Sequence, residues 1–200
     1  MLLAAILNLG IGIYTIFLVA RGFFGEDHKI DWAKGGKSMR FFTTLSNVFS
    51  AILCLIVGLI EVFSGKAEGA LMLVKYISCV SVMVTFVTVM VFLGPIYCYK
   101  SQLAGAGMWV HLFGPVLALI VFAFLEKGLK ISFGQALLGL LPTLIYGAFY
   151  LYMVVVRTEK NGGWEDFYAF NRSGKWPISF GAMVVGTGVL CALVTFLHNL

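Results

Sequence analysis

Two threonines and one histidine are the residues of this sequence whose types suit nucleophilic chemistry. Thr43 and Thr44 open a long apolar stretch, and Asn47 follows within one helical turn, on the same face of a helix. His111 lies in another apolar stretch. A threonine hydroxyl is a weak nucleophile unless a base within hydrogen-bond distance takes its proton, and histidine is the most common base. Thr43, Thr44 and His111 are therefore candidate catalytic residues, and Asn47 is the candidate donor to an oxyanion.

The same residues also have a structural interpretation. Threonines inside apolar helices usually bond to their own helix or to a neighbouring helix. Ser46 points to a different face from Thr43 and Thr44, so we expect it to pack. His111 is the only histidine well inside an apolar stretch, which argues against a bis-histidine haem and against a zinc site. A lone imidazole there is a packed neutral side chain, a proton relay or a general base. We expect no metal and no cofactor.

The composition places these residues in a membrane protein. Of the 200 residues, 60% are hydrophobic and only 12% are charged, and the mean hydropathy is +0.98. Soluble domains contain about 25% charged residues. No loop is long enough for a soluble domain, so residues 1–200 are expected to form a single integral membrane domain. The basic residues lie in loops between the apolar segments and do not form a basic patch interleaved with aromatic residues. The lipid bilayer is therefore an expected partner and nucleic acid is not.

Six segments have the roughly 20 mostly apolar residues that a membrane span requires. We predict an all-α bundle of six transmembrane helices, over residues 2–20, 41–63, 70–97, 108–125, 135–156 and 178–197. The first segment has no basic residues before its apolar run, so we interpret it as a retained helix and not as a cleaved signal peptide. Gly94-Pro95 and Gly114-Pro115 indicate breaks in the third and fourth spans.

The distribution of Lys and Arg predicts the orientation. The loops after the first, third and fifth spans carry ten of these residues, and the loops on the other side carry three. The positive-inside rule places the ten in the cytoplasm and both termini outside, and the compact loops suggest a bacterial cytoplasmic membrane. The second and fourth spans then both begin at the cytoplasmic face. Thr43, Thr44 and His111 therefore enter the membrane at similar depth.

Other residues in the predicted spans have structural explanations. Lys75 and Glu61 lie near the outer ends of two spans, where we expect them to pair or Lys75 to reach the headgroups. Tyr146 and Tyr150 belong to a stripe at helical spacing, which forms either core or the wall of an acyl-chain groove, and Thr88 is a further candidate for that wall. The four cysteines form no C-x-x-C pair, so we expect buried thiols and neither a disulfide framework nor a zinc site.

Three short motifs resemble those of a known family. They are Phe-Thr-Thr-Leu-Ser-Asn at 42–47, Phe-Leu-Gly-Pro at 92–95, and His111 followed by Pro115. They look like the androgen-induced and androgen-dependent TFPI-regulating family of membrane proteins, and more closely like its bacterial six-transmembrane relatives. Characterised members hydrolyse fatty acid esters of hydroxy fatty acids with an intramembrane threonine and histidine. The resemblance implies His111 as the histidine. The preceding aromatic residue favours Thr43 as the threonine, and the polar residue at Asn47 favours Thr44.

The resemblance thus implies an intramembrane lipid-ester hydrolase. The threonine would attack the acyl carbon, and His111 would take the hydroxyl proton and return it to the leaving alcohol. The substrate would be a membrane lipid or a fatty acid ester that enters from the bilayer. Two alternatives stay open from the residues alone: a small transporter, and a bundle that binds a lipid or a partner without chemistry. The sequence contains neither a Gly-x-Ser-x-Gly elbow nor a His-Glu-x-x-His motif.

Overall fold

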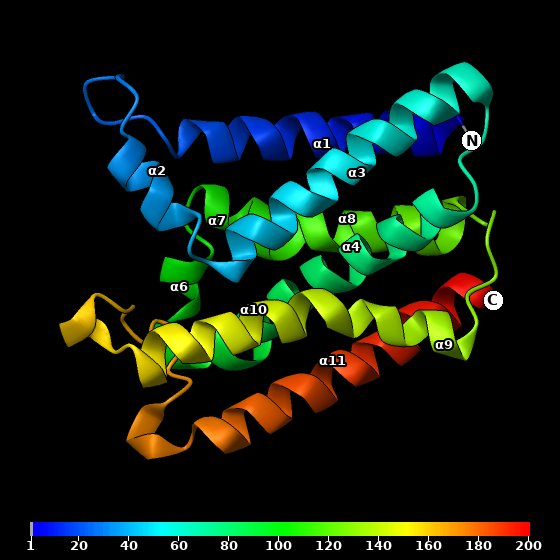
Figure 1. Cartoon of the computed structure of the whole chain (residues 1–200). Coiled ribbons are helices and arrows are strands. Elements are labelled where there is room, and N and C mark those ends of the chain that lie inside the picture. The colour runs from blue at the N-terminus through cyan, green and yellow to red at the C-terminus, as the bar shows by residue number, and fades with distance from the viewer. Residues whose placement is uncertain (1) are drawn as a thin grey trace.

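Six long helices run back and forth to form a bundle (Figure 1). The computed structural model describes residues 2–200, and this part of the chain forms helices and loops without a β-strand. The helical spans are Leu2–Arg21, Phe42–Ser64, Ala70–Tyr97, Ala106–Leu125, Phe133–Val156 and Trp176–Asn199. Each predicted span is confirmed, with ends that differ by at most two residues. The length and apolar character of these helices make the chain a multi-pass membrane protein.

The first, second and sixth spans are single helices: α1 (Leu2–Arg21), α3 (Phe42–Ser64) and α11 (Trp176–Asn199). The other spans contain tighter or wider turns. The third consists of α4 (Ala70–Val87), the π-helix η1 (Thr88–Leu93) and α5 (Gly94–Tyr97). The fourth consists of α7 (Ala106–Met108), η2 (Trp109–Phe113), α8 (Gly114–Ile120) and η3 (Val121–Leu125). The fifth consists of α9 (Phe133–Ala136), η4 (Leu137–Leu140), α10 (Leu141–Leu151) and η5 (Tyr152–Val156). Four short helices lie in the loops: α2 (Trp32–Ser38), α6 (Tyr99–Gln102), η6 (Glu159–Asn161) and η7 (Arg172–Gly174).

Prolines explain two of the irregular turns. Pro95 and Pro115 each lie in the first turn of the helix that follows a π-helical segment, η1 or η2. A proline has no N–H to donate to the carbonyl four residues earlier, and its ring clashes with that carbonyl. A wider turn before the proline accommodates both effects. The predicted breaks are therefore confirmed, as π-helical turns inside otherwise helical spans.

Helix α4 lies at the centre of the bundle. It contacts α3 and α8 on one side and α10 and α11 on the other. Its side chains Tyr76 and Val80 are fully buried and join Phe122 in the main hydrophobic core. Helix α1 packs closely against α3, because glycines bring the backbones of these two helices together. A Cβ atom on Gly12 would lie 2.9 Å from the carbonyl oxygen of Ala51.

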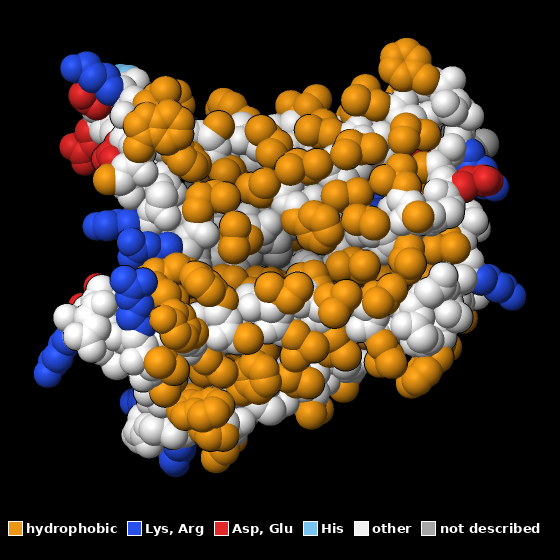
Figure 2. Space-filling model, in the orientation of Figure 1, with side chains coloured by type: hydrophobic (Ala, Val, Ile, Leu, Met, Phe, Trp, Pro, Cys, Tyr) orange, Lys and Arg blue, Asp and Glu red, His pale blue; other side chains and the backbone are white. Residues whose placement is uncertain are grey.

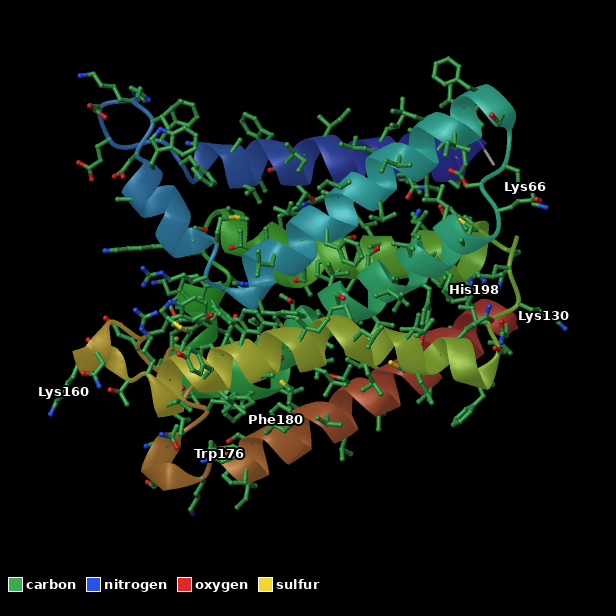
Figure 3. The ribbon with its side chains drawn as sticks, viewed as in Figure 1. Lys66, Lys130, Lys160, Trp176, Phe180 and His198 are labelled. Carbon is green, nitrogen blue, oxygen red and sulfur yellow. The ribbon has the colours of Figure 1, made fainter. Side chains whose placement is uncertain are left out.

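The surface of the bundle matches a bilayer. Hydrophobic side chains cover the face along the helices, and charged side chains gather at its two ends (Figure 2). We call one end the basic end, because its loops at 21–41, 98–105 and 157–175 contain ten Lys and Arg residues. The opposite end comprises residues 65–69 and 126–132 and lies beside both chain termini. Lys160 marks the basic end, and Lys66 and Lys130 mark the opposite end (Figure 3).

One expectation about the cysteines is wrong. Cys54, Cys79 and Cys191 are buried thiols as predicted, but Cys98 is exposed. The third span ends at Tyr97, and Cys98 has a φ of 71°, which turns the chain into the loop helix α6. The apolar run in the sequence does not indicate this turn.

Candidate functional site

A cavity of about 310 Å³ lies in the half of the bundle nearer the basic end. Its walls come from α4 and η1 on one side and from α10 and α11 on the other, and the start of α3 and the loop at 166–170 complete it. The lining is mainly apolar, and no lining residue in the described chain is charged. Nine lining residues carry a hydroxyl group: Thr43, Thr85, Thr88, Thr143, Tyr146, Tyr150, Tyr168, Ser179 and Thr187.

The loop between the fifth and sixth spans covers this cavity at the basic end. The Asp166 carboxylate holds the loop, because it accepts hydrogen bonds from the backbone N–H groups of Phe170 (2.8 Å) and Asn171 (2.7 Å). It also accepts a bond from the Tyr150 hydroxyl at 2.9 Å. The same hydroxyl accepts the backbone N–H of Tyr168 at 3.1 Å. The buried Tyr150 side chain therefore ties the loop to the membrane helix α10.

Tyr168 links this loop to the start of α3. The helix begins without a side-chain cap, and the backbone N–H of Phe42 donates to the Tyr168 hydroxyl at 2.9 Å. This bond satisfies one of the amide groups that a helix start leaves unpaired. Burial raises the pKa of Tyr168, so it stays a neutral hydroxyl. The Thr43 side chain lies beside the same hydroxyl. The first turn of α3 is therefore held against the covering loop.

The structure brings four of the candidate residues to one cavity. Thr43 lines it together with Thr88, Tyr146 and Tyr150, the three residues predicted to line a substrate groove. Tyr146 also donates to the carbonyl oxygen of Arg40 at 2.7 Å, which places this ring against the start of α3. The shared lining makes a common role possible for these four residues. Their individual roles stay predictions.

Thr44 and Asn47 lie outside the cavity lining. The Thr44 hydroxyl is 3.3 Å from the Ser38 hydroxyl. The Asn47 side-chain amide donates to the carbonyl oxygens of Thr43 (2.8 Å) and Val110 (3.0 Å), so it joins α3 to η2. Ser46 is buried and its hydroxyl lies 2.8 Å from that of Thr85, which confirms that it packs.

His111 also lies away from the cavity lining. Its Nδ1 atom is 2.7 Å from the carbonyl oxygen of Gln102. The bond between Asn47 and Val110 shows that the second and fourth spans are neighbours at this depth, which is the condition for Thr43 or Thr44 to meet His111. Within residues 2–200, however, no hydrogen bond joins His111 to Thr43 or Thr44. The threonine–histidine pair is thus close in depth but not assembled.

Sequence reasoning did not identify Thr143, which also lines the cavity. This side chain is 3% exposed, and its hydroxyl has no hydrogen-bond partner within the described protein. Thr187, on the facing helix α11, donates instead to the carbonyl oxygen of Met183 at 2.8 Å. Because buried hydroxyls are nearly always paired, an unpaired hydroxyl in the cavity wall is unusual. No sequence signal distinguishes it from the other threonines, since only packing leaves a hydroxyl unpaired.

A second polar cluster lies near the opposite end. It consists of Asn8 on α1, Glu61 on α3, Lys75 on α4 and Glu126 directly after η3, all of them buried. Lys75 forms an ion pair with Glu126 and donates to the side-chain amide oxygen (Oδ1) of Asn8 at 2.6 Å. The Asn8 amide nitrogen donates to Glu61 (3.1 Å) and to Glu126 (2.6 Å). We call these four residues the Lys75 network.

The Lys75 network corrects two expectations. Lys75 was predicted to pair with Glu61 or to reach the headgroups, but it is buried and its carboxylate partner is Glu126. Glu61 reaches the network only through the amide of Asn8. Asn8 carries no sequence signal of such a role, because nothing in an apolar span marks which of its few polar residues meets a charge on another helix. Glu126 carries none because it lies just beyond a predicted span.

No protein-family model, curated protein or solved structure matches this chain. The function is therefore inferred from geometry. The structure shows two buried polar regions in one helical membrane bundle, an uncharged cavity and a charged network.

Proposed function

We propose that this protein binds a membrane lipid in the cavity between α4, α10 and α11. The observation that carries the proposal is the cavity wall, which is apolar and uncharged but contains nine hydroxyl groups. Ligand sites have this character, with many apolar residues and a few polar groups that orient the ligand. The volume of about 310 Å³ suits one acyl chain and not a whole phospholipid.

The positions of the hydroxyl groups suggest how the lipid lies. Tyr150 and Tyr168 are near the basic end, where the polar end of a lipid would be placed. Thr143 precedes Tyr150 by seven positions on α10, so it lies roughly 10 Å deeper at 1.5 Å per residue. Hydroxyl-bearing side chains at both depths favour a lipid with an ester or hydroxyl group partway along its chain.

Photocrosslinking tests this proposal. The purified protein is incubated with a fatty acid that carries a photoreactive group in its chain, and the labelled peptides are mapped. Gly186 lines the cavity and a Cβ atom there meets nothing within 4 Å, so Gly186→Leu adds a side chain at the cavity wall without a clash at Cβ. Gly181 has the same open surroundings but does not line the cavity, so Gly181→Leu is the matched control.

We expect crosslinks on α10 and α11 that Gly186→Leu reduces several-fold and Gly181→Leu leaves unchanged. Equal labelling of the wild-type protein and Gly186→Leu, or labelling spread over the outer faces of α1 and α3, would contradict lipid binding in this cavity.

A second candidate is hydrolysis of a lipid ester at Thr43, as the family resemblance implies. The observation that favours it is that Thr43 lines the lipid cavity. The reaction needs a ring nitrogen of His111 within about 2.6–3.2 Å of the threonine hydroxyl. Nδ1 is bonded to Gln102, so Nε2 is the nitrogen that would approach Thr43.

Labelling with a fluorophosphonate probe, followed by peptide mapping, separates binding from catalysis. Catalysis predicts an adduct on Thr43 that is lost in both Thr43→Val and His111→Gln, with Thr44→Val as the neighbouring control. Ester hydrolysis that continues unchanged in all three variants would exclude this chemistry and leave lipid binding intact.

We also propose that the basic end faces the cytoplasm of a bacterial cell, because its loops contain most of the Lys and Arg residues. Cys98 is an exposed thiol at this end, whereas Cys54, Cys79 and Cys191 are buried. A thiol reagent that does not cross membranes should label Cys98 in inside-out vesicles and not in whole cells. Lys130→Cys, at the opposite end, should show the reverse pattern in a Cys98→Ser background.

A further inference from the structure

The Lys75 network contains more acidic side chains than basic ones. It contains the carboxyl groups of Glu61 and Glu126 and only one cation, the Lys75 ammonium. If all three were ionised, one negative charge would stay uncompensated at a buried position. Such a charge costs several kcal/mol inside a protein or membrane, and neighbouring groups or protons usually remove it.

We propose that the Lys75 network is an intramembrane proton-binding site, in which Glu61 holds the proton and Glu126 holds the negative charge. A proton on one carboxyl group brings the net charge of the network to zero. No bond other than the O–H bond forms or breaks, and the proton comes from water at the opposite end of the bundle.

The hydrogen bonds decide which carboxyl group is protonated. One oxygen of Glu126 accepts from both Lys75 and Asn8, so the charge on Glu126 is directly compensated. Within the described chain, the carboxyl group of Glu61 accepts a hydrogen bond only from the side-chain amide of Asn8 and forms no ion pair. Two carboxylates bridged by one amide repel each other, and the one without a cation takes up the proton more readily.

An unsatisfied atom points to the same conclusion. The Oε2 atom of Glu126 is buried and has no hydrogen-bond partner within the described protein. A buried carboxylate oxygen normally accepts a hydrogen bond. It is therefore an open acceptor position on the charged carboxylate, for the O–H group of a protonated neighbour or of a water molecule.

Among the side chains of residues 2–200, no further cation pairs with the network. Cys54 on α3 and Cys79 on α4 lie close enough to the network to interact with its charges, but a neutral thiol compensates none of them. Lys127 points to the end of α11, where it donates to the His198 carbonyl oxygen at 2.9 Å. The His198 ring lies between the carbonyl oxygens of Phe122 and Leu129.

The position of Glu61 allows a proton to enter. It lies near the end of α3, which finishes at Ser64, and it is 8% exposed. Among residues 2–200 there is no group of three or more His, Cys, Asp or Glu side chains that fits a metal ion. The Lys75 ammonium lies between Asn8 and Glu126. A proton is the cation that this arrangement accommodates.

Infrared spectroscopy of the purified protein tests the proposal. At neutral pH the wild-type protein should show the C=O band of a protonated carboxylic acid, and this band should shift in D₂O because the proton exchanges. Glu61→Gln should lose the band and fold normally, since its neutral amide has nearly the shape of the protonated acid. Glu68→Gln is the matched control at the same end, because Glu68 is exposed and pairs with Lys66. It should keep the band.

Two results would overturn the proposal: no acid band in the wild-type protein, or a band that persists in Glu61→Gln. In the second case, loss of the band in Glu126→Gln would place the proton on Glu126. The first result needs no variant at all, so the proposal can be tested even if a substitution prevents folding.

Discussion

The cavity and the Lys75 network keep polar groups inside one apolar bundle in different ways. The cavity contains hydroxyl groups without charges, and one of them, on Thr143, has no partner within the described protein. The network contains charges that three helices and the residue after η3 bring together, and its members bond directly to one another. Polar groups in a membrane protein need partners. We infer that the network mainly supplies its own and that the cavity receives some from a lipid.

Glycine contributes to both regions, with opposite effects. Near the network, Gly12 lets α1 approach α3, since any larger side chain would meet the Ala51 carbonyl. At the cavity, a side chain on Gly186 would extend into open space. The same residue type therefore closes one helix interface and leaves room in another.

The largest expected effect is the loss of the network cation. Lys75→Met leaves Glu126 buried without its ion-pair partner, so we expect the free energy of unfolding to fall by about 3–5 kcal/mol. Thermal or denaturant unfolding in detergent measures it. The double variant Lys75→Met/Glu126→Gln should recover much of the loss, because it removes the unpaired charge.

Lys66→Met is the control for this substitution. Lys66 pairs with Glu68 at the surface, where 53% of its side chain is exposed. We therefore expect the free energy of unfolding to fall by less than about 1 kcal/mol. Similar losses for Lys75→Met and Lys66→Met would show that the network adds nothing beyond a surface ion pair.

An intermediate loss of stability is expected when the loop that covers the cavity is weakened. Asp166→Ala removes the acceptor of three hydrogen bonds, from Tyr150, Phe170 and Asn171. We expect a loss of about 1.5–3 kcal/mol, because bonds to a charged group are the stronger ones. Faster exchange of bound lipid should accompany it, measured by displacement of a fluorescent fatty acid.

The exposed Asp27 provides the control for the loop. Its carboxylate accepts one backbone bond from Lys29, and Asp27→Ala should change stability by no more than about 0.5 kcal/mol. If Asp166→Ala changed neither stability nor lipid exchange, the loop would not be a cover for the cavity.

The smallest changes in stability are expected at two threonines that line the cavity, and the two changes should have opposite signs. Thr143→Val removes a buried hydroxyl without a protein partner, so the delipidated protein should gain about 1 kcal/mol of stability. Thr187→Val removes the hydrogen bond to the Met183 carbonyl oxygen and should lower the free energy of unfolding by about 1 kcal/mol. Thermal unfolding of both variants measures the two changes. Equal destabilisation would mean that the Thr143 hydroxyl is already paired.

Part of the cavity could be predicted from the sequence. Tyr146 and Tyr150 share a helix face, and Thr43 follows the aromatic residue that begins the second span. The structure places all three on the cavity lining, together with Thr88. Spacing along one helix is a local property, so it survives folding. The contribution of α11 to the cavity and the unpaired hydroxyl of Thr143 both depend on how two helices pack. The spacing of residues in the sequence does not predict that packing.

The pairing of residues on different helices was the part that sequence reasoning could not determine. The spans of Thr43 and His111 lie at similar depth and are in contact. The rotation of η2 about its axis nevertheless directs the His111 ring to Gln102. Likewise, Lys75 and Glu61 were matched by depth, yet the partner of Lys75 is Glu126, after the fourth span. Depth follows from residue counting, whereas rotation about the helix axis does not.

The sequence by itself determined the class of protein, the six spans and the breaks at Pro95 and Pro115, because length, hydropathy and a missing N–H act locally. Only the tertiary structure decided which side chains meet in the cavity and in the Lys75 network. The physical reason is that a membrane helix is apolar on its lipid side as well as on its core side. The pattern that marks the buried face of a soluble helix is therefore weak here, and packing alone selects that face.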